Sequence, residues 1–218
     1  MFDFGGVLTR VPGPEHWEAL LAAIYGANSD GLLPALQAQY YAHRDDFDRG
    51  RLSAREYWAA VLSTLGVDAG EGNLLQRLFE LDTAAWTRKR EGMCEWAAGL
   101  RAAGVATGIL SNMPQDVLER VEAGMHWAAD FHPRVYSCRV GLVKPEAAIY
   151  RALLDDLDVP AESVLFLDDR EENAQAAREL GMAAERFVTL EQILPVVRER
   201  YGLPGLETRG GDPSGTAS

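Results

Sequence analysis

VLFLDDREENAQAARELG, residues 164–181, carries the clearest structural signal in this 218-residue chain. Residues 164–167 form a short, continuous apolar run, which is typical of a strand buried on both faces of a parallel sheet. Asp168 and Asp169 follow directly, and residues 172–180 have the spacing of a helix that Gly181 ends. A buried strand, a carboxylate pair and a helix in succession indicate an α/β unit with polar groups where the strand ends.

The same alternation extends outward from this stretch through the second half of the chain. Short apolar runs predict further strands at 105–110, 134–138 and 184–188. Helical spacing predicts helices at 114–123, 147–157 and 191–200. Strands that alternate with helices of this length form right-handed βαβ units. The predicted fold class is therefore α/β, a doubly wound parallel sheet of the Rossmann-like kind.

The first half of the chain has a different pattern, helical from Pro14 to about Arg90 with little strand signal. Ser53, with Glu56 three residues later, is a capping box that predicts a helix start. We therefore expect a helical cap inserted at 12–90 into one α/β core made of 1–11 and 91–205. The segment 206–218 is rich in Gly, Ser, Thr and Pro, which predicts a disordered tail.

Composition narrows the range of functions. Lys and Arg number 21 against 33 Asp and Glu, so the formal charge is −12, which argues against a nucleic-acid partner. No apolar run approaches the roughly 20 residues that span a bilayer, and because no basic stretch followed by an apolar one opens the sequence, we expect no signal peptide. Two cysteines do not suggest a disulfide framework. These features predict a cytoplasmic protein with no membrane partner.

Polar side chains of different kinds stand at the expected strand ends, where ligands bind in open parallel sheets. They are Asp3, Ser111 with Asn112, Lys144, and Asp168 with Asp169. Three carboxylates at one edge need a cation, and Mg²⁺ accepts oxygen ligands while it keeps sites for water and phosphate. An aspartate can attack phosphorus, while an ammonium and a hydroxyl hold the phosphoryl oxygens. The pattern predicts a metal-assisted phosphoryl-transfer site.

These segments resemble, in order and spacing, the four motifs of the haloacid dehalogenase-like (HAD) hydrolase superfamily. The motifs are DFGGVLT at 3–9, SN at 111–112, KP at 144–145 within VGLVKPEAAIY, and DDREEN at 168–173. The stretch FDRGRLSAREYW is similar to helical caps near the glucose-1-phosphate phosphatases and the phosphatase domain of soluble epoxide hydrolase. The resemblance implies a Rossmann-like core with an inserted helical cap.

The resemblance also implies a Mg²⁺ site and a nucleophile. Asp3 would attack the phosphoryl group and bind the metal, while Gly5 would offer only its backbone carbonyl. Asp169 would bind the metal directly, and Asp168 would bind it through water or stand behind the direct ligands. The implied reaction proceeds through an aspartyl-phosphate on Asp3.

The remaining motifs imply contacts with the substrate. Ser111 and Asn112 would bind the phosphoryl group, and Lys144 would neutralise it and orient Asp3. The implied protein is a Mg²⁺-dependent phosphatase of a small phosphorylated metabolite, with that substrate lying between cap and core. The identity of the metabolite and the oligomeric state do not follow from these motifs.

Position 5 departs from the family pattern. Most HAD phosphatases carry an aspartate two residues after the nucleophile, as general acid/base for the leaving alcohol, but this chain has Gly5. His43, Asp45 or Asp46 of the cap, or a water molecule, are candidates to supply the proton instead. Two alternatives stay open: a 2-haloacid dehalogenase-like hydrolase, and a HAD-fold binding protein with weakened catalysis.

The start of the chain is also unusual. Only Met1 and Phe2 precede Asp3, whereas a central buried strand usually has about five residues. We therefore expect the native protein to begin upstream of Met1.

Overall fold

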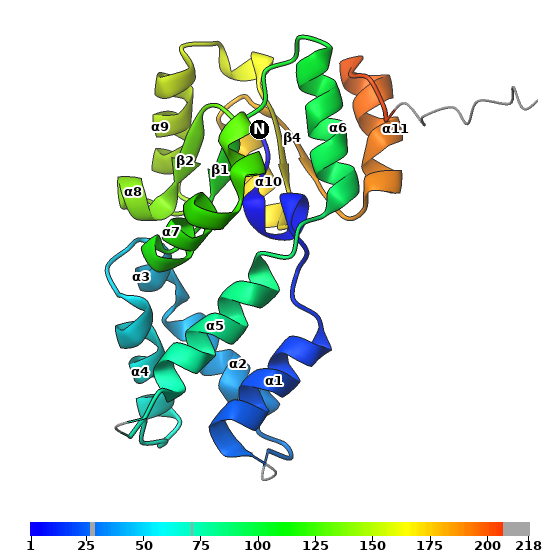
Figure 1. Ribbon diagram of the computed structural model, residues 1–218. Coiled ribbons are helices and arrows are strands. Elements are labelled where there is room, and N and C mark those ends of the chain that lie inside the picture. Colours follow the sequence, from blue (N-terminus) through cyan, green and yellow to red (C-terminus); the bar gives the residue numbers. More distant parts are fainter. Residues whose placement is uncertain (27–28, 71, 207–218) are drawn as a thin grey trace, which may run out of the picture.

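The computed structural model describes residues 1–26, 29–70 and 72–206. Two lobes lie one above the other, an α/β lobe around a sheet and a lobe of helices only (Figure 1). Residues 207–218, which include nearly all of the predicted disordered tail, lie outside the described residues. The predicted α/β fold with helices gathered in a second lobe is confirmed.

The sheet is parallel, with the N-terminal segment at its centre. Strand β1 (Ile109–Ser111) pairs with β2 (Arg134–Tyr136), and β3 (Leu165–Asp168) pairs with β4 (Ala183–Arg186). Phe2 joins the two pairs, because it forms parallel bridges to both Ile109 and Leu167. The order is therefore β2, β1, the N-terminal segment, β3, β4. Because the strands are parallel, their carboxyl ends lie at the same edge of the sheet, and the loops that follow the strands begin there.

Side chains that alternate along the strands pack against helices on both faces. Ile109 and Leu167 belong to the core that includes α6 (Glu91–Ala102) and α11 (Leu190–Tyr201). Their neighbours Leu110 and Phe166 belong to the core with α9 (Ala147–Leu157) and α10 (Glu171–Glu179). Helix α7 (Gln115–Gly124) follows β1. This two-sided cover is that of a doubly wound sheet.

Two predicted strands are shorter than their apolar runs suggest. The run 105–110 pairs regularly only from Ile109, because residues 105–108 make isolated hydrogen bonds, such as that from the Phe2 N–H to the Gly108 carbonyl. The run 134–138 ends at Tyr136, because Ser137 begins the short helix α8 (Ser137–Val140). The buried Ser137 hydroxyl makes contacts with the other lobe that a strand residue would not reach.

Helix α5 is the centre of the helical lobe. The lobe consists of α1 (Pro14–Tyr25), α2 (Leu33–Ala42), α3 (Arg44–Asp48), α4 (Ala54–Thr64) and α5 (Leu74–Trp86). Both α1 and α4 pack on α5. The predicted capping box is confirmed, since the Glu56 N–H donates to the Ser53 hydroxyl and the Ser53 N–H donates to the Glu56 carboxylate. None of the helices in the described ranges is long and apolar enough to cross a membrane.

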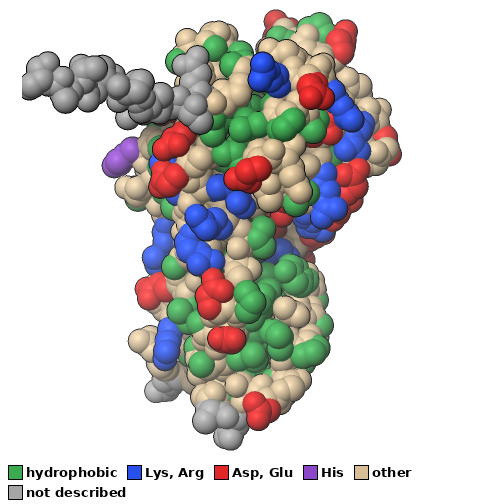
Figure 2. Space-filling model, turned by 90° about the vertical axis from the view of Figure 1, so that its right-hand side faces the viewer, with side chains coloured by type: hydrophobic (Ala, Val, Ile, Leu, Met, Phe, Trp, Pro, Cys, Tyr) green, Lys and Arg blue, Asp and Glu red, His purple; other side chains and the backbone are tan. Residues whose placement is uncertain are grey.

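Two chain segments connect the lobes and pair with each other. Thr9 and Lys89 form an antiparallel bridge, the Arg10 N–H donates to the Arg88 carbonyl at 2.7 Å, and the Arg90 N–H donates to the Leu8 carbonyl at 2.9 Å. Figure 2 shows Lys and Arg side chains gathered where the lobes meet. The paired connection fixes the start of the cap relative to the loop after Asp3. We propose that the cap spans residues 12–90.

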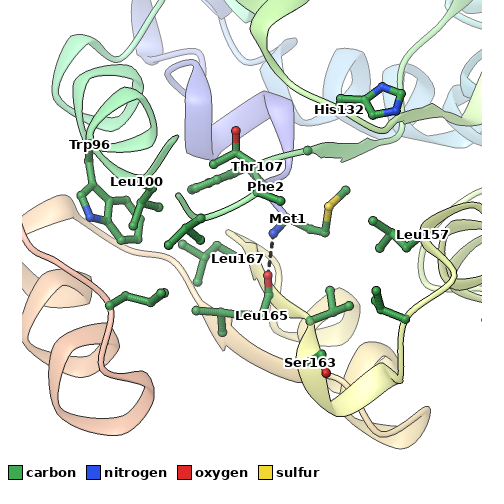
Figure 3. Close-up of a pocket in the computed structure, with 16 residues that line it drawn as sticks. Met1, Phe2, Trp96, Leu100, Thr107, His132, Leu157, Ser163, Leu165 and Leu167 are labelled. Atoms are coloured by element: carbon green, nitrogen blue, oxygen red, sulfur yellow. Dashed lines mark hydrogen bonds between the residues drawn. The ribbon is translucent and has the colours of Figure 1, made fainter. Parts of the chain in front are cut away.

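The amino end of the sheet holds an apolar cavity of about 240 Å³ beside Met1 (Figure 3). The Met1 amine donates to the Leu165 carbonyl at 2.6 Å, and Trp96, Leu100 and Leu157 line the space around it. Burial lowers the pKa of this amine from 8.0 to about 5. A buried polar amine and an apolar cavity beside it both reduce stability.

We predict that three apolar residues added before Met1 stabilise the fold. They would fill the cavity and move the amine into solvent, so the melting temperature should rise by roughly 4 °C or more. Thermal unfolding followed by circular dichroism checks this.

A Gly-Ser-Asp extension of equal length is the control, since it moves the amine but adds little apolar surface. The two extensions should differ clearly in melting temperature. Equal melting temperatures for both extensions and the parent chain would show that the cavity does not limit stability.

Candidate active site

The turn Phe4–Leu8 presents the Asp3 carboxylate at the carboxyl edge of the sheet. The Phe4 N–H donates to Asp3 Oδ1 at 2.7 Å, which fixes the side chain. Gly6 has φ 85°, and a Cβ at this position would lie 2.5 Å from the carboxyl carbon of Asp169. Only glycine therefore lets the turn close against Asp169, and that contact brings Asp169 beside Asp3.

The Lys144 ammonium joins two strand ends. Its Nζ lies 3.0 Å from Asp3 Oδ1 and 2.6 Å from Asp168 Oδ2, and it donates to the Leu110 carbonyl at 3.1 Å. The Lys144 residue is only 3% exposed. Burial lowers the pKa of Lys144, but Asp168 and Asp3 outweigh it, and the pKa lies above its usual value. The lysine therefore stays charged although it is buried.

Asp168 holds this lysine in place. Its Oδ1 accepts hydrogen bonds from the Arg170 N–H and the Asn173 side-chain amide, each at 2.9 Å, while Oδ2 accepts from Lys144. Both carboxylate oxygens of Asp168 thus already accept hydrogen bonds, and the side chain is fully buried. Asn173, to which the sequence analysis gave no role, fixes the orientation of Asp168 from the first turn of α10.

Ser111 and Asn112 follow β1 and face the same site. The buried Ser111 side chain lies beside Asp3 and lowers the pKa of that carboxyl. The Asn112 amide donates to the Lys144 carbonyl at 3.0 Å, and the Lys144 N–H donates to Asn112 Oδ1 at 2.8 Å. The side chain of Asn112 therefore clamps the backbone that carries Lys144.

Three carboxylates converge at this edge. Asp3, Asp168 and Asp169 each offer an oxygen within 4.8 Å of the others. Burial raises the pKa of Asp3 to about 7, with Lys144 opposing and both other aspartates adding to the rise. Burial and the neighbouring Asp168 raise the pKa of Asp169 to about 6. One ammonium does not offset three carboxylates, and an all-oxygen donor set fits a hard divalent cation such as Mg²⁺.

A small cavity between the lobes adjoins this cluster. Gly5, Ser111 and Asn112 line it from the core, and Arg44 and Trp86 line it from the cap. Arg44 and Trp86 were not identified from the sequence. Arg44 begins α3 and Trp86 ends α5, and neither belongs to a recognisable sequence motif. Their position beside the site becomes apparent only when the two lobes pack together.

The cap residues that the sequence suggested as proton donors lie elsewhere. Among the described residues, His43, Asp45 and Asp46 are not part of the lining of this cavity. Asp45 and Asp46 are exposed, and Asp46 pairs with Arg51 at 2.9 Å. The structure thus brings Asp3, Ser111, Asn112, Lys144, Asp168 and Asp169 together, and leaves these three cap residues outside.

Polar contacts hold the cap on the core. The Ser137 hydroxyl donates to the Asp48 carbonyl at 2.5 Å and accepts from the Met113 N–H at 2.8 Å. Arg49 forms an ion pair with Glu146 across the same interface. These contacts keep α3, and with it Arg44, next to the loop that follows β1.

Comparison with known proteins identifies the family of the chain. The sequence model of the haloacid dehalogenase-like hydrolases matches residues 1–181. The chain is 32% identical to bifunctional epoxide hydrolase 2 of Rattus norvegicus over 199 residues, which is 83% of this chain and 34% of that protein. It thus spans about a third of that relative's length.

Two further relatives cover most of the chain. A sesquiterpene phosphatase of Aspergillus oryzae is 25% identical over 84% of this chain and 85% of its own length. A HAD family enzyme of Bacteroides thetaiotaomicron, solved with magnesium and inorganic phosphate, has a TM-score of 0.67 at 18% identity, over 85% of this chain and 91% of its own. That structure shares the fold. Because the family model matches residues 1–181, most of this chain, the chain belongs to the haloacid dehalogenase-like hydrolases.

Proposed function

We propose that the protein is a Mg²⁺-dependent phosphatase of a small phosphorylated metabolite, with Asp3 as the nucleophile. The observation that carries the proposal is the buried Lys144 ammonium, shared by Asp3 at 3.0 Å and Asp168 at 2.6 Å, with Asp169 next to both. A fixed cation beside a candidate nucleophile suits a phosphoryl group, which carries negative charge on three oxygens. The phosphatase among the relatives supports the same reaction class.

The residues act in two steps. An Asp3 oxygen attacks phosphorus, the new O–P bond forms, and the bond from phosphorus to the leaving oxygen breaks. Lys144, the Ser111 hydroxyl and the Asn112 backbone N–H hold the phosphoryl oxygens, since the Asn112 side chain is engaged with Lys144. Water then cleaves the aspartyl-phosphate, releasing phosphate and restoring Asp3.

Asp3, Asp169 and the Gly5 carbonyl would hold Mg²⁺ in this proposal, with Asp168 behind them. Asp168 suits that indirect place because its oxygens already accept hydrogen bonds from Lys144, Arg170 and Asn173. The bound metal would offset the remaining carboxylate charge and stabilise charge on the phosphoryl oxygens. The relative solved with magnesium and phosphate supports this choice of metal.

The proposal extends to partners and location. The partner is a small phosphorylated molecule, and the net charge of −12 argues against nucleic acid. We place the enzyme in the cytoplasm without a membrane partner, in keeping with its two free cysteines.

One prediction of the proposed function concerns the nucleophile. The chain should hydrolyse p-nitrophenyl phosphate with Mg²⁺, and Asp3→Asn should lower kcat/KM by at least about 10³-fold because an amide is a poor nucleophile. Release of p-nitrophenol measures this. Asp155→Asn, at an exposed position on α9, is the matched control and should retain full activity.

The same assay addresses the two alternatives. Hydrolysis of a 2-haloacid that survives EDTA would replace this proposal with dehalogenation, against which the Asp168–Asp169 pair counts. Mg²⁺ binding without turnover of any phosphate would make the chain a binding protein. Turnover that persists in Asp3→Asn would contradict the assigned nucleophile.

Another prediction of the proposed function concerns the pH dependence of Mg²⁺ binding. The pKa of Asp3 is raised to about 7 and that of Asp169 to about 6, so without metal these groups bind protons as the pH falls through that range. Mg²⁺ needs the ionised carboxylates, so its affinity should fall from pH 7.5 to 5.5, with protons released on binding. Isothermal titration calorimetry in two buffers of different ionisation enthalpy measures both quantities.

Asp169→Asn should weaken Mg²⁺ binding and reduce the number of protons released. An affinity that stays constant between pH 5.5 and 7.5 would show that these carboxylates do not bind the metal.

A further inference from the structure

The cavity between the lobes is where a leaving group would lie. In phosphoryl transfer the leaving oxygen stands roughly in line with the attacking oxygen, on the far side of phosphorus. With Asp3 at the edge of the sheet, the far side is the cavity that Gly5 lines from the core and Arg44 and Trp86 line from the cap. The side chains of this cavity therefore decide how the leaving group departs.

This cavity offers no acid to protonate an alkoxide. Among the described residues, its lining includes no carboxylate, imidazole, thiol or phenol. Gly5 has an ordinary backbone conformation, φ −73° and ψ 127°, that any residue can adopt. A Cβ at Gly5 would lie 3.4 Å from the Trp86 ring, in normal van der Waals contact. The indole thus borders the place where a side chain at position 5 would project.

The cap places a guanidinium there instead, held by two buried carboxylates. Arg44 Nε lies 3.0 Å from Asp48 Oδ1, and Nη1 lies 3.5 Å from Asp82 Oδ2 and donates to Tyr40 Oη at 2.9 Å. Among the described residues, none accepts a hydrogen bond from Nη2 of Arg44. A guanidinium does not release its proton, but it stabilises an oxyanion that is already charged.

The Trp86 N–H is also committed. It donates to Tyr40 Oη at 2.9 Å, and Tyr40 in turn donates to Asp82 at 2.9 Å. Tyr40 is 1% exposed, so this network fixes the cap wall and lies behind it. The leaving group meets an indole face and a guanidinium.

We infer that the substrate is a phosphoryl compound whose leaving group departs as a stable oxyanion: an aryl phosphate, an acyl phosphate or a phosphoanhydride. The inference rests on the proposed function and specifies its substrate class. In the first step the electron pair of the breaking P–O bond stays on the leaving oxygen, and Arg44 stabilises that charge. The oxyanion takes its proton from solvent after release. Simple alkyl phosphates are poor substrates, because an alkoxide is too basic to leave unprotonated.

The test compares leaving groups in the whole enzyme with Mg²⁺. The substrates are p-nitrophenyl phosphate, phenyl phosphate, acetyl phosphate, inorganic pyrophosphate and ethyl phosphate. Phenol has a pKa near 10, whereas that of a water-like hydroxyl is roughly 16. We expect kcat/KM to fall steeply with leaving-group basicity, with ethyl phosphate below p-nitrophenyl phosphate by about 10²-fold or more. The preferred compound among the first four identifies the leaving-group class.

Two variants at one position isolate the missing acid. Gly5→Asp should raise the ratio of kcat/KM on ethyl phosphate to kcat/KM on p-nitrophenyl phosphate by about 10²-fold or more. Gly5→Asn, of nearly equal shape, cannot act as an acid and should give no such gain. Melting temperatures establish that both variants fold. The comparison of substrates with the parent enzyme does not depend on either variant.

The outcomes separate this inference from the proposed function. Ethyl and p-nitrophenyl phosphate hydrolysed with kcat/KM within tenfold of each other would overturn the inference and leave the phosphatase intact. An equal gain in Gly5→Asp and Gly5→Asn would also overturn it. Failure to hydrolyse any phosphate, or activity that survives Asp3→Asn, would overturn the proposed function and with it this inference.

Discussion

A buried ammonium needs partners, and in this protein that need organises the site. Lys144 is 3% exposed, and a lone charge in such surroundings costs several kcal/mol. Asp3 and Asp168 come from different strand ends, and both lie within ion-pair distance of its Nζ. Asn173 and the Arg170 N–H hold Asp168, while Asn112 holds the backbone of Lys144. Loops distant along the chain are thus tied to one charged atom.

The core and the cap divide the work of the proposed reaction. The core supplies the nucleophile, the lysine and the carboxylates at the edge of a rigid parallel sheet. The cap supplies Arg44 and Trp86, which Ser137 and the Arg49–Glu146 pair hold over the loop after β1. In the proposed reaction the phosphoryl group lies on the core side and the leaving group on the cap side. We therefore expect substitutions in the cap to alter substrate preference, while phosphoryl transfer to Asp3 is unchanged.

Much of this arrangement follows from the sequence because strand ends of a parallel sheet converge. Asp3, Lys144 and the Asp168–Asp169 pair could be placed at one edge from spacing alone, and the apolar run at 164–167 located its strand. The rest depends on contacts that no local pattern records. Ser137 sits in an apolar run that resembles a longer strand, but its hydroxyl turns to the cap. Arg44 and Trp86 meet Gly5 only through the packing of two lobes, and Asn112 bonds to Lys144, 32 residues away.

The most direct measurement is to trap the covalent intermediate. The aspartyl-phosphate is an acyl phosphate, which borohydride reduces to an alcohol, so the attacked aspartate becomes homoserine. Without a side chain at position 5 to activate water, the intermediate should break down slowly and accumulate. We predict that enzyme quenched during turnover of p-nitrophenyl phosphate with Mg²⁺ and reduced with borohydride carries homoserine at position 3 by mass spectrometry. Homoserine at another aspartate, or steady turnover with an unmodified Asp3, would contradict the account.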